Sequence, residues 1–243
     1  MSDVAKNQVA IVTGGTAGIG LACAATLIFQ GFTRLTVVGR SEARGMAARE
    51  FLRKKYPNAD VRFVAADVST PAGANSAVEA FAATFGRIDA LISVAGGAPI
   101  PRLLHEIPIE DVGRIIGSIS SGVLLPVRAV LPIMMEKKAG SIICIASDAA
   151  KVAILVEVAI GAAMAAIAMF CRALAIETKR SGIRVNCVTP SVVKDTPFYS
   201  TLMADPYASK LFSKAERLAL LGVVEQGILH PSSHFSLVRA RPG

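Results

Sequence analysis

A glycine-rich turn between a strand-like run and a helix-like run constrains the fold more than any other feature of this sequence. The run VAIVTGG at residues 9–15 is rich in β-branched residues, which favour a buried strand, and it ends in two glycines. The run IGLACAATLIFQG at residues 19–31 has the composition of a buried helix and closes on a glycine, which is a helix C-cap signal. A strand, a glycine turn and a helix in this order predict the opening of a β-α-β unit.

The spacing of the glycines in this turn predicts a site for phosphate groups. Gly14, Gly18 and Gly20 allow a tight turn and a close approach of a pyrophosphate to the backbone. The N-terminus of the helix that follows offers unpaired N–H groups and the positive end of the helix dipole. The alternative is a turn that only packs the helix on the sheet, which would use the same glycines.

Strand-like and helix-like patterns alternate along most of the chain. Further strands are predicted at residues 35–40, 61–69, 88–97, 140–147 and 182–190. Further helices are predicted at residues 42–56, 73–86, 109–138 and 160–180. The helix at 109–138 contains Pro126 and Pro132, which predict an irregularity at the first proline and an end near the second. This alternation predicts an α/β fold, namely a Rossmann-like doubly wound parallel sheet with helices on both faces.

The length of 243 residues favours a single domain over residues 1–243, and the sequence contains no internal repeat and no linker. The segment at 225–243 is rich in Pro, Ser, His and Arg and follows neither a helical nor a strand pattern. We therefore expect a C-terminus that is divergent or truncated.

Composition argues against several classes of function. The net charge is +8, but the basic residues are dispersed, so no focused stripe for nucleic acid is predicted. The N-terminal MSDVAKNQ is polar, and the longest uncharged run, between Glu157 and Arg172, is shorter than a membrane span. The four cysteines are far apart in apolar surroundings, which predicts reduced, buried thiols rather than disulfides or a metal site. We expect a cytoplasmic protein that binds neither nucleic acid nor a membrane.

Four motifs together resemble those of the short-chain dehydrogenase/reductase family. TGGTAGIG at 13–20 resembles the glycine signature of the family, and AADVS at 65–69 resembles the stretch whose Asp meets the adenine. SVAGG at 93–97 resembles the N-N-A-G turn, and GIRVNCVTPS at 182–191 resembles the R-V-N-x-x-x-P-G strand. The resemblance extends over residues 7–224. It implies a dinucleotide-binding α/β fold and oxidoreductase chemistry.

The resemblance also implies a cofactor site and no metal site. The cofactor-binding residues that it assigns are Gly14, Thr16, Gly18, Ile19, Gly20, Arg40, Ser41, Asp67, Val68, Ala95 and Gly96. NAD-binding relatives usually carry an acidic residue after the second strand, where this chain has Arg40, a side chain that could meet a 2′-phosphate. NADP is therefore slightly favoured over NAD, the alternative being a surface arginine. Val94, Ser191 and the delayed Thr196 depart from the family pattern in the nicotinamide half of the site.

The catalytic positions of the family can be assigned by their spacing. The family uses a Ser, a Tyr, a Lys four residues after the Tyr, and an Asn in the long helix. Ser147 ends the strand-like run SIICIAS and matches the Ser, but the Tyr position thirteen residues later is Ile160 and the Lys position is Met164. The N-x-x-G motif reads ISSG, so Ile119 stands at the Asn position. Neither Ile nor Met exchanges protons at neutral pH, so Ser147 is interpreted as a catalytic remnant.

Four titratable residues near these positions are candidates for a replacement acid: His105, Asp148, Lys151 and Glu157. Charged residues in loops are usually solvated, so the sequence does not favour a substitute catalytic role for any of them.

Three functions fit this pattern. The favoured one is a silent subunit that pairs with an active family member through the helices around 109–131 and 160–180. This resembles heteromeric hydroxyacyl-CoA dehydrogenases such as those acting on 2-(hydroxybenzyl)succinyl-CoA. The second is an active NAD(P)-dependent oxidoreductase that acts on a small-molecule substrate through a non-standard proton relay. The third is a nucleotide-binding sensor without turnover.

Overall fold

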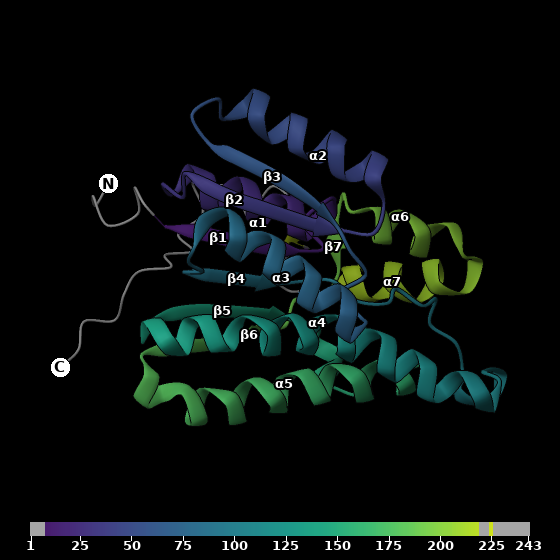
Figure 1. The fold of residues 1–243 in the computed structure, drawn as a ribbon. Coiled ribbons are helices and arrows are strands. Elements are labelled where there is room, and N and C mark those ends of the chain that lie inside the picture. Colours follow the sequence, from purple (N-terminus) through teal and green to yellow (C-terminus); the bar gives the residue numbers. More distant parts are fainter. Residues whose placement is uncertain (1–7, 219–223, 226–243) are drawn as a thin grey trace.

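A six-stranded parallel sheet with helices on both faces forms the centre of the molecule (Figure 1). The computed structural model describes residues 8–218 and 224–225. The strands are β1 Val9–Thr13, β2 Arg34–Gly39, β3 Asp60–Ala65, β4 Ala90–Ser93, β5 Gly140–Ile145 and β6 Ile183–Val188. They lie in the order β3-β2-β1-β4-β5-β6, all paired in parallel. The predicted doubly wound α/β fold is confirmed, and its strand order reverses between β1 and β4, where such folds bind their ligands.

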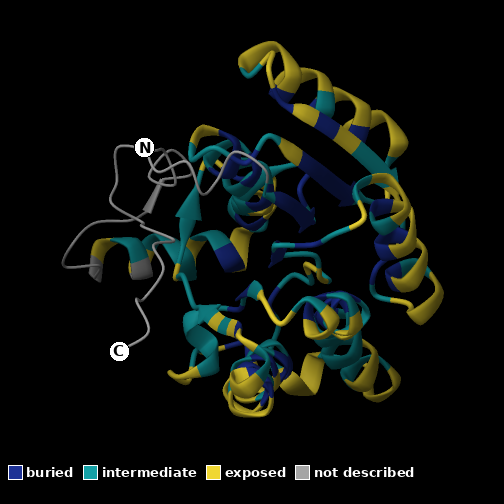
Figure 2. Cartoon of the chain, turned by 60° about the vertical axis from the view of Figure 1, so that its left-hand side comes forward, coloured by how far each residue is buried: buried dark blue, intermediate teal, exposed yellow. Residues whose placement is uncertain are grey.

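Five helices cover the two faces of the sheet. They are α1 Gly18–Phe29, α2 Glu42–Lys55, α3 Pro71–Phe85, α4 Ile109–Lys137 and α5 Val158–Thr178. The side chains of β1 alternate between the faces, as the two-residue period of a strand requires. Val9 and Ile11 join the core that contains residues of α3, α4 and α5, whereas Ala10 and Val12 join the core under α1 and α2. Figure 2 shows the buried residues on the strands and on the inward sides of the helices.

Shorter elements complete the described chain. The turns η2 Leu104–Glu106, η3 Asp148–Ala150 and η4 Lys179–Ser181 are single 3₁₀ turns. The helices α6 Pro197–Ala204 and α7 Pro206–Leu218 follow the sheet, and the two-residue strands β7 Val193–Lys194 and β8 Val224–Glu225 pair with each other. Residues 226–243 of the predicted atypical tail lie outside the described residues.

The long helix α4 differs from the prediction, because it does not end near Pro132. It continues through Pro126 and Pro132 to Lys137, and Lys138 closes it with a φ of 53°. A proline inside a helix removes one hydrogen bond and costs about 3 kcal/mol. Burial compensates this cost. Val127 and Val130, between the two prolines, and Met134, after the second proline, are fully buried.

Two helical segments, Ile109–Lys137 and Val158–Ser181, are long and apolar enough to cross a membrane by length and composition alone. The segment Val158–Ser181 contains the uncharged run of the sequence prediction and extends past it through Arg172. The finding is weak evidence for a membrane span, because the core helix of a soluble protein passes the same test. Here the two helices pack against each other, and both contribute buried residues to the core on one face of the sheet.

The predicted burial of the cysteines is correct for Cys144 and Cys171 only. Cys23 and Cys187 are partly exposed, and all four thiols are free. In the part of the chain that the structure describes, no group of three or more His, Cys, Asp or Glu side chains could hold a metal ion.

Candidate functional site

The glycine turn lies at the carboxyl end of β1, where the strand order reverses. Gly14 has a φ of 68°, and a Cβ at Gly20 would lie 2.2 Å from the carbonyl oxygen of Gly14. Neither position therefore accepts a side chain without moving the backbone. Ala17 is the N-cap of α1 and makes no side-chain hydrogen bond there. The turn therefore leads directly into a helix N-terminus, whose backbone N–H groups and dipole favour a pyrophosphate.

The turn after β4 closes against the turn after β1. A Cβ at Gly14 would lie 2.9 Å from the backbone nitrogen of Ala95, so the two predicted site residues are brought together by backbone contact. A Cβ at the neighbouring Gly96 would lie 3.3 Å from the carbonyl oxygen of Ile119 in α4. Gly18 lies beside Thr196, because its Cβ would come within 3.5 Å of the Thr196 side chain.

The ends of β2 and β3 supply the residues predicted to hold the adenosine. Arg40 is exposed, and its charge acts on Asp67, which is also exposed. The Asp67 carboxylate accepts hydrogen bonds from the Ser69 hydroxyl (2.6 Å) and the Ser69 N–H (3.1 Å). These bonds, and then the charge of Arg40, lower the pKa of Asp67, so this carboxylate stays ionised and able to accept further hydrogen bonds.

The remaining predicted cofactor residues lie close to the same edge. The Thr16 side chain lies against Gly39 at the end of β2, where a Cβ would come within 2.7 Å of its methyl group. Ile19 lies in the first turn of α1. Ser41 accepts a hydrogen bond from the N–H of Arg44 (3.4 Å) and so caps α2, and Val68 is 4 % exposed, so its side chain belongs to the core. The set as a whole fits a dinucleotide, because the glycine turn leads into the N-terminus of α1 and is flanked by one cation, Arg40, and one anion, Asp67.

The positions predicted for the catalytic Asn, Tyr and Lys contain apolar side chains that are packed. Ile119 is 2 % exposed and belongs to the core between the sheet and its helices. Ile160 and Met164 are half-buried and pack against the same core. None of these groups exchanges a proton, and their packing leaves them no polar role.

Ser147 follows β5 and keeps a polar environment. Its hydroxyl donates a hydrogen bond to Oδ1 of Asp148 (2.9 Å) and accepts one from the N–H of Ala149 (3.3 Å). The hydroxyl therefore caps the η3 turn and is coupled to a carboxylate. That coupling was not predicted, because only the fold of the turn brings the adjacent side chains into contact.

Glu157 is a site residue whose environment the sequence prediction missed. It was expected to be solvated like other loop charges, but it is 9 % exposed. Burial, and then the charge of Asp148, raise the pKa of Glu157 from 4.5 to about 7. Lys151 and His105, the other two candidates, are exposed. The signal in the sequence was the apolar run ILVEVAI, in which Glu157 is the only charge.

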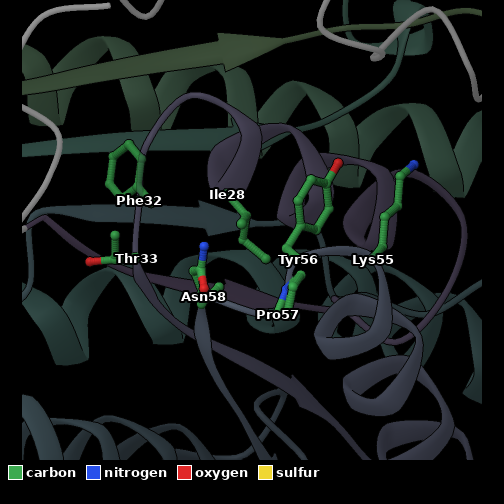
Figure 3. Close-up of a pocket in the computed structure, with 8 residues that line it drawn as sticks. Ile28, Phe32, Thr33, Lys55, Tyr56, Pro57 and Asn58 are labelled. Atoms are coloured by element: carbon green, nitrogen blue, oxygen red, sulfur yellow. The ribbon is translucent and has the colours of Figure 1, made fainter.

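A separate hollow lies at the opposite edge of the sheet, near the amino ends of β2 and β3 (Figure 3). It is lined by Ile28, Phe32, Thr33, Lys55, Tyr56, Pro57, Asn58 and Ala59. Its one cation, Lys55, lies over the rings of Phe51 and Tyr56, at 5.9 and 5.7 Å from their centroids. None of the predicted site residues reaches this hollow.

Comparison with known proteins assigns the chain to a family. Residues 8–206 match the profile described as short chain dehydrogenase. The chain is 33% identical to 2-(R)-hydroxypropyl-CoM dehydrogenase of Xanthobacter autotrophicus over 82% of this chain and 80% of that protein. It is also 33% identical to D-threitol dehydrogenase of Mycolicibacterium smegmatis, over 76% of this chain and 70% of that protein.

Solved structures show the same fold. Levodione reductase superposes with a TM-score of 0.83 at 27% identity, covering 91% of this chain and 86% of that chain. An NADPH-bound short chain oxidoreductase from Pseudomonas aeruginosa, described as containing an atypical catalytic center, superposes with a TM-score of 0.80 at 26% identity, with the same two coverages of 91% and 86%. The chain therefore belongs to the short-chain dehydrogenase/reductase family of oxidoreductases.

Proposed function

We propose that this chain is a dinucleotide-binding subunit that has lost the proton relay of its family and completes a dehydrogenase by pairing with an active relative. The observation that carries the proposal is the packing of Ile119, Ile160 and Met164 at the positions of the catalytic Asn, Tyr and Lys. The glycine turn and the helix N-terminus that follows it are retained in the same chain. Loss of the proton-transferring side chains together with retention of the cofactor-binding turn is the pattern expected of a silent subunit.

The outward face of α5 supports pairing with another subunit. Val158, Met169 and Ile176 on this helix are 56 %, 61 % and 78 % exposed. Small residues at Ala162, Ala165, Ala166 and Ala173 lie exposed between them. A helix that leaves so many apolar side chains in water has a face suited to close packing with a helix of a partner. We propose that this partner is an active family member in the cytoplasm, and that the substrate class is a hydroxyacyl-CoA such as 2-(hydroxybenzyl)succinyl-CoA.

The bound cofactor would be NADP or NAD, held by the turn after β1, by Arg40 and Asp67, and by the turn after β4. When bound, it supplies or accepts the hydride of the family reaction. The residues of this chain bind and orient it, and the partner would supply the proton transfer.

The test is gentle isolation of the tagged full-length chain from its own host, followed by native mass measurement. The expected result is a complex that contains a second family member with Tyr and Lys at the two positions that are Ile160 and Met164 here. Recovery of a complex built only from copies of this chain would contradict the silent-subunit proposal.

Arg40 gives a prediction about the choice of cofactor. Arg40→Ala is expected to weaken NADPH binding on the order of tenfold and to leave NADH binding unchanged, since a charge-assisted contact to the 2′-phosphate is lost. Titration of both cofactors by fluorescence measures the two affinities. Arg44→Ala, at an exposed arginine of α2, is the matched control. An equal loss of affinity for NADPH and NADH would remove the basis for preferring NADP.

A second candidate function is an oxidoreductase that turns over by itself through a different proton relay. The specific observation in its favour is the buried carboxyl of Glu157 beside the Ser147–Asp148 pair. Relatives named as dehydrogenases, and the solved neighbour described as containing an atypical catalytic center, are consistent with this candidate. Turnover of the purified chain alone would favour it over the silent subunit.

A further inference from the structure

Three polar residues lie where the η3 turn packs against the start of α5. Ser147 follows β5, Asp148 begins η3, and Glu157 precedes the first residue of α5. The Ser147 hydroxyl donates to Oδ1 of Asp148 at 2.9 Å, and the charge of Asp148 reaches the carboxyl of Glu157. Glu157 stands three residues before Ile160, which is one turn of the helix before the position of the missing tyrosine.

The burial of Glu157 needs an explanation. The residue is 9 % exposed. Its carboxyl makes no hydrogen bond within residues 8–218 and 224–225, and it keeps contact with solvent, because no fully buried side-chain oxygen in that part of the chain lacks a partner. Taking an ionisable group largely out of water without a partner is costly, so such a position is usually apolar. A largely buried carboxyl that still reaches solvent, close to a hydroxyl–carboxylate pair, is typical of a functional site.

The backbone around Glu157 is held in place from several directions. The preceding Val156 has a φ of 67°, which is rare for a β-branched residue, and it is 3 % exposed. The carbonyl of Val156 accepts a hydrogen bond from the N–H of Arg102 (3.2 Å). The Glu157 N–H donates to Ile154 (3.2 Å), and its carbonyl accepts from the N–H of Gly161 (2.6 Å). The left-handed backbone at Val156 therefore lies directly before the buried residue 157.

We propose that Ser147, Asp148 and Glu157 form the proton relay of this chain, in which Ser147 Oγ exchanges the proton with the substrate oxygen and Glu157 stores it. The inference rests on the second candidate function, in which the chain turns over by itself. Ser147 is then the catalytic residue, and Asp148 and Glu157 act through it.

These groups account for the path of the proton in the reaction. In the oxidation of an alcohol, the O–H bond of the substrate breaks and its proton passes to Ser147 Oγ while the proton of Ser147 passes to Oδ1 of Asp148. A solvent water then carries the proton from Asp148 to the Glu157 carboxylate, which releases it to solvent. The electron pair and hydrogen of the substrate C–H bond leave with the bound oxidised dinucleotide, and the carbonyl bond forms. Reduction runs through the same groups in reverse.

The electrostatics of the site support the storage role. Burial, followed by the charge of Asp148, raises the pKa of Glu157 to about 7, near the value that suits an acid–base group at neutral pH. The cations nearby do not pair with it. The guanidinium of Arg102 is bound to Oδ2 of Asp205 (2.7 Å), and Lys151 at the end of η3 is exposed.

The test compares the full-length wild-type chain with Glu157→Gln, Glu157→Asp and the matched control Glu79→Gln, at an exposed glutamate of α3. Each variant is first titrated with NADPH and NADH. Turnover is then measured from pH 5 to 9 with NADP⁺ or NAD⁺ and a panel of secondary alcohols and 3-hydroxyacyl-CoA thioesters. Independently of activity, difference infrared spectroscopy of the cofactor-free chain follows the C=O band of a protonated carboxyl over the same pH range.

The expected result has four parts. Wild-type kcat rises with pH through about 7. Glu157→Gln loses about 10²-fold or more in kcat with unchanged cofactor affinity, and its profile loses the inflection. Glu157→Asp recovers part of the rate, and Glu79→Gln behaves as wild type. The infrared band that disappears between pH 6 and 8 in the wild type is absent in Glu157→Gln.

Four outcomes overturn the relay, and they separate it from the proposed functions. Turnover by Glu157→Gln within twofold of wild type, or a wild-type chain without a carboxyl band that titrates near pH 7, excludes Glu157. Cofactor binding by a wild-type chain that turns over no substrate excludes the relay and leaves the silent subunit standing. Failure to bind either cofactor at millimolar concentration contradicts both proposed functions.

Discussion

Replacing Ile119, Ile160 and Met164 together by Asn, Tyr and Lys is expected to raise the turnover of this chain by about 10²- to 10⁴-fold, the usual worth of general acid–base catalysis. The physical reason is that three of the four predicted catalytic positions have no polar group. The fourth position, Ser147, and the glycine turn are present. Because such groups act as a unit, each single substitution is expected to change little. The measurement is kcat with NADP⁺ or NAD⁺ and a panel of secondary alcohols.

The control keeps the shape of the triple variant and removes only its reactive hydroxyl. It carries Ile119→Asn, Ile160→Phe and Met164→Lys, and it should remain at the wild-type rate. Ile119 is 2 % exposed, so an Asn there costs roughly 1–3 kcal/mol unless it finds a partner, and both variants should be assayed well below their melting temperatures. A folded, cofactor-binding triple variant with no gain over the phenylalanine control would show that more than these three groups was lost.

Glu157→Gln is expected to make the chain more stable than wild type above pH 7, by about 3 kcal/mol at most, since each pKa unit corresponds to about 1.4 kcal/mol. Below about pH 4.5 the carboxyl is protonated in both the folded and the unfolded chain. As the pH rises, the unfolded chain releases its proton first, so the free energy of unfolding falls until the pH passes about 7, where the folded chain also releases it. A neutral amide removes this pH dependence.

The measurement is the free energy of unfolding by urea at several pH values between 4 and 9 for both proteins. Glu79→Gln controls for the loss of one negative charge at an exposed site. Parallel pH curves for wild type and Glu157→Gln would mean that Glu157 titrates normally, and this would also remove the support that its pKa gives to the relay.

Several features of the fold and site could be predicted because they depend on local patterns. The alternation of strands and helices, which starts with VAIVTGG, can be predicted from side-chain periods of two and 3.6 residues. These periods depend only on residues that are neighbours in the sequence. The prediction that Ile160 and Met164 stand at the catalytic positions depends on counting from Ser147 along one continuous segment. Both kinds of inference need no knowledge of what packs against the segment.

Other features were mispredicted or missed because distant residues decide them. The end of α4 was placed near Pro132, but the helix continues to Lys137 because its buried side chains outweigh the local cost of the prolines. Glu157 was expected in water, because a charge in a loop is usually solvated. Its burial depends on the path of the chain at Val156, which a backbone bond from Arg102 holds.

The sequence by itself determined the family and the order of the strands and helices, and it predicts that the catalytic positions lack a tyrosine and a lysine. Only the tertiary structure decided that Gly14 meets Ala95 across the sheet edge, that Arg40 acts on Asp67, and that Glu157 is buried beside the Ser147–Asp148 pair. The physical reason is that residue identity and periodicity act over a few positions, whereas burial and electrostatic coupling depend on which distant segments of the chain are brought together.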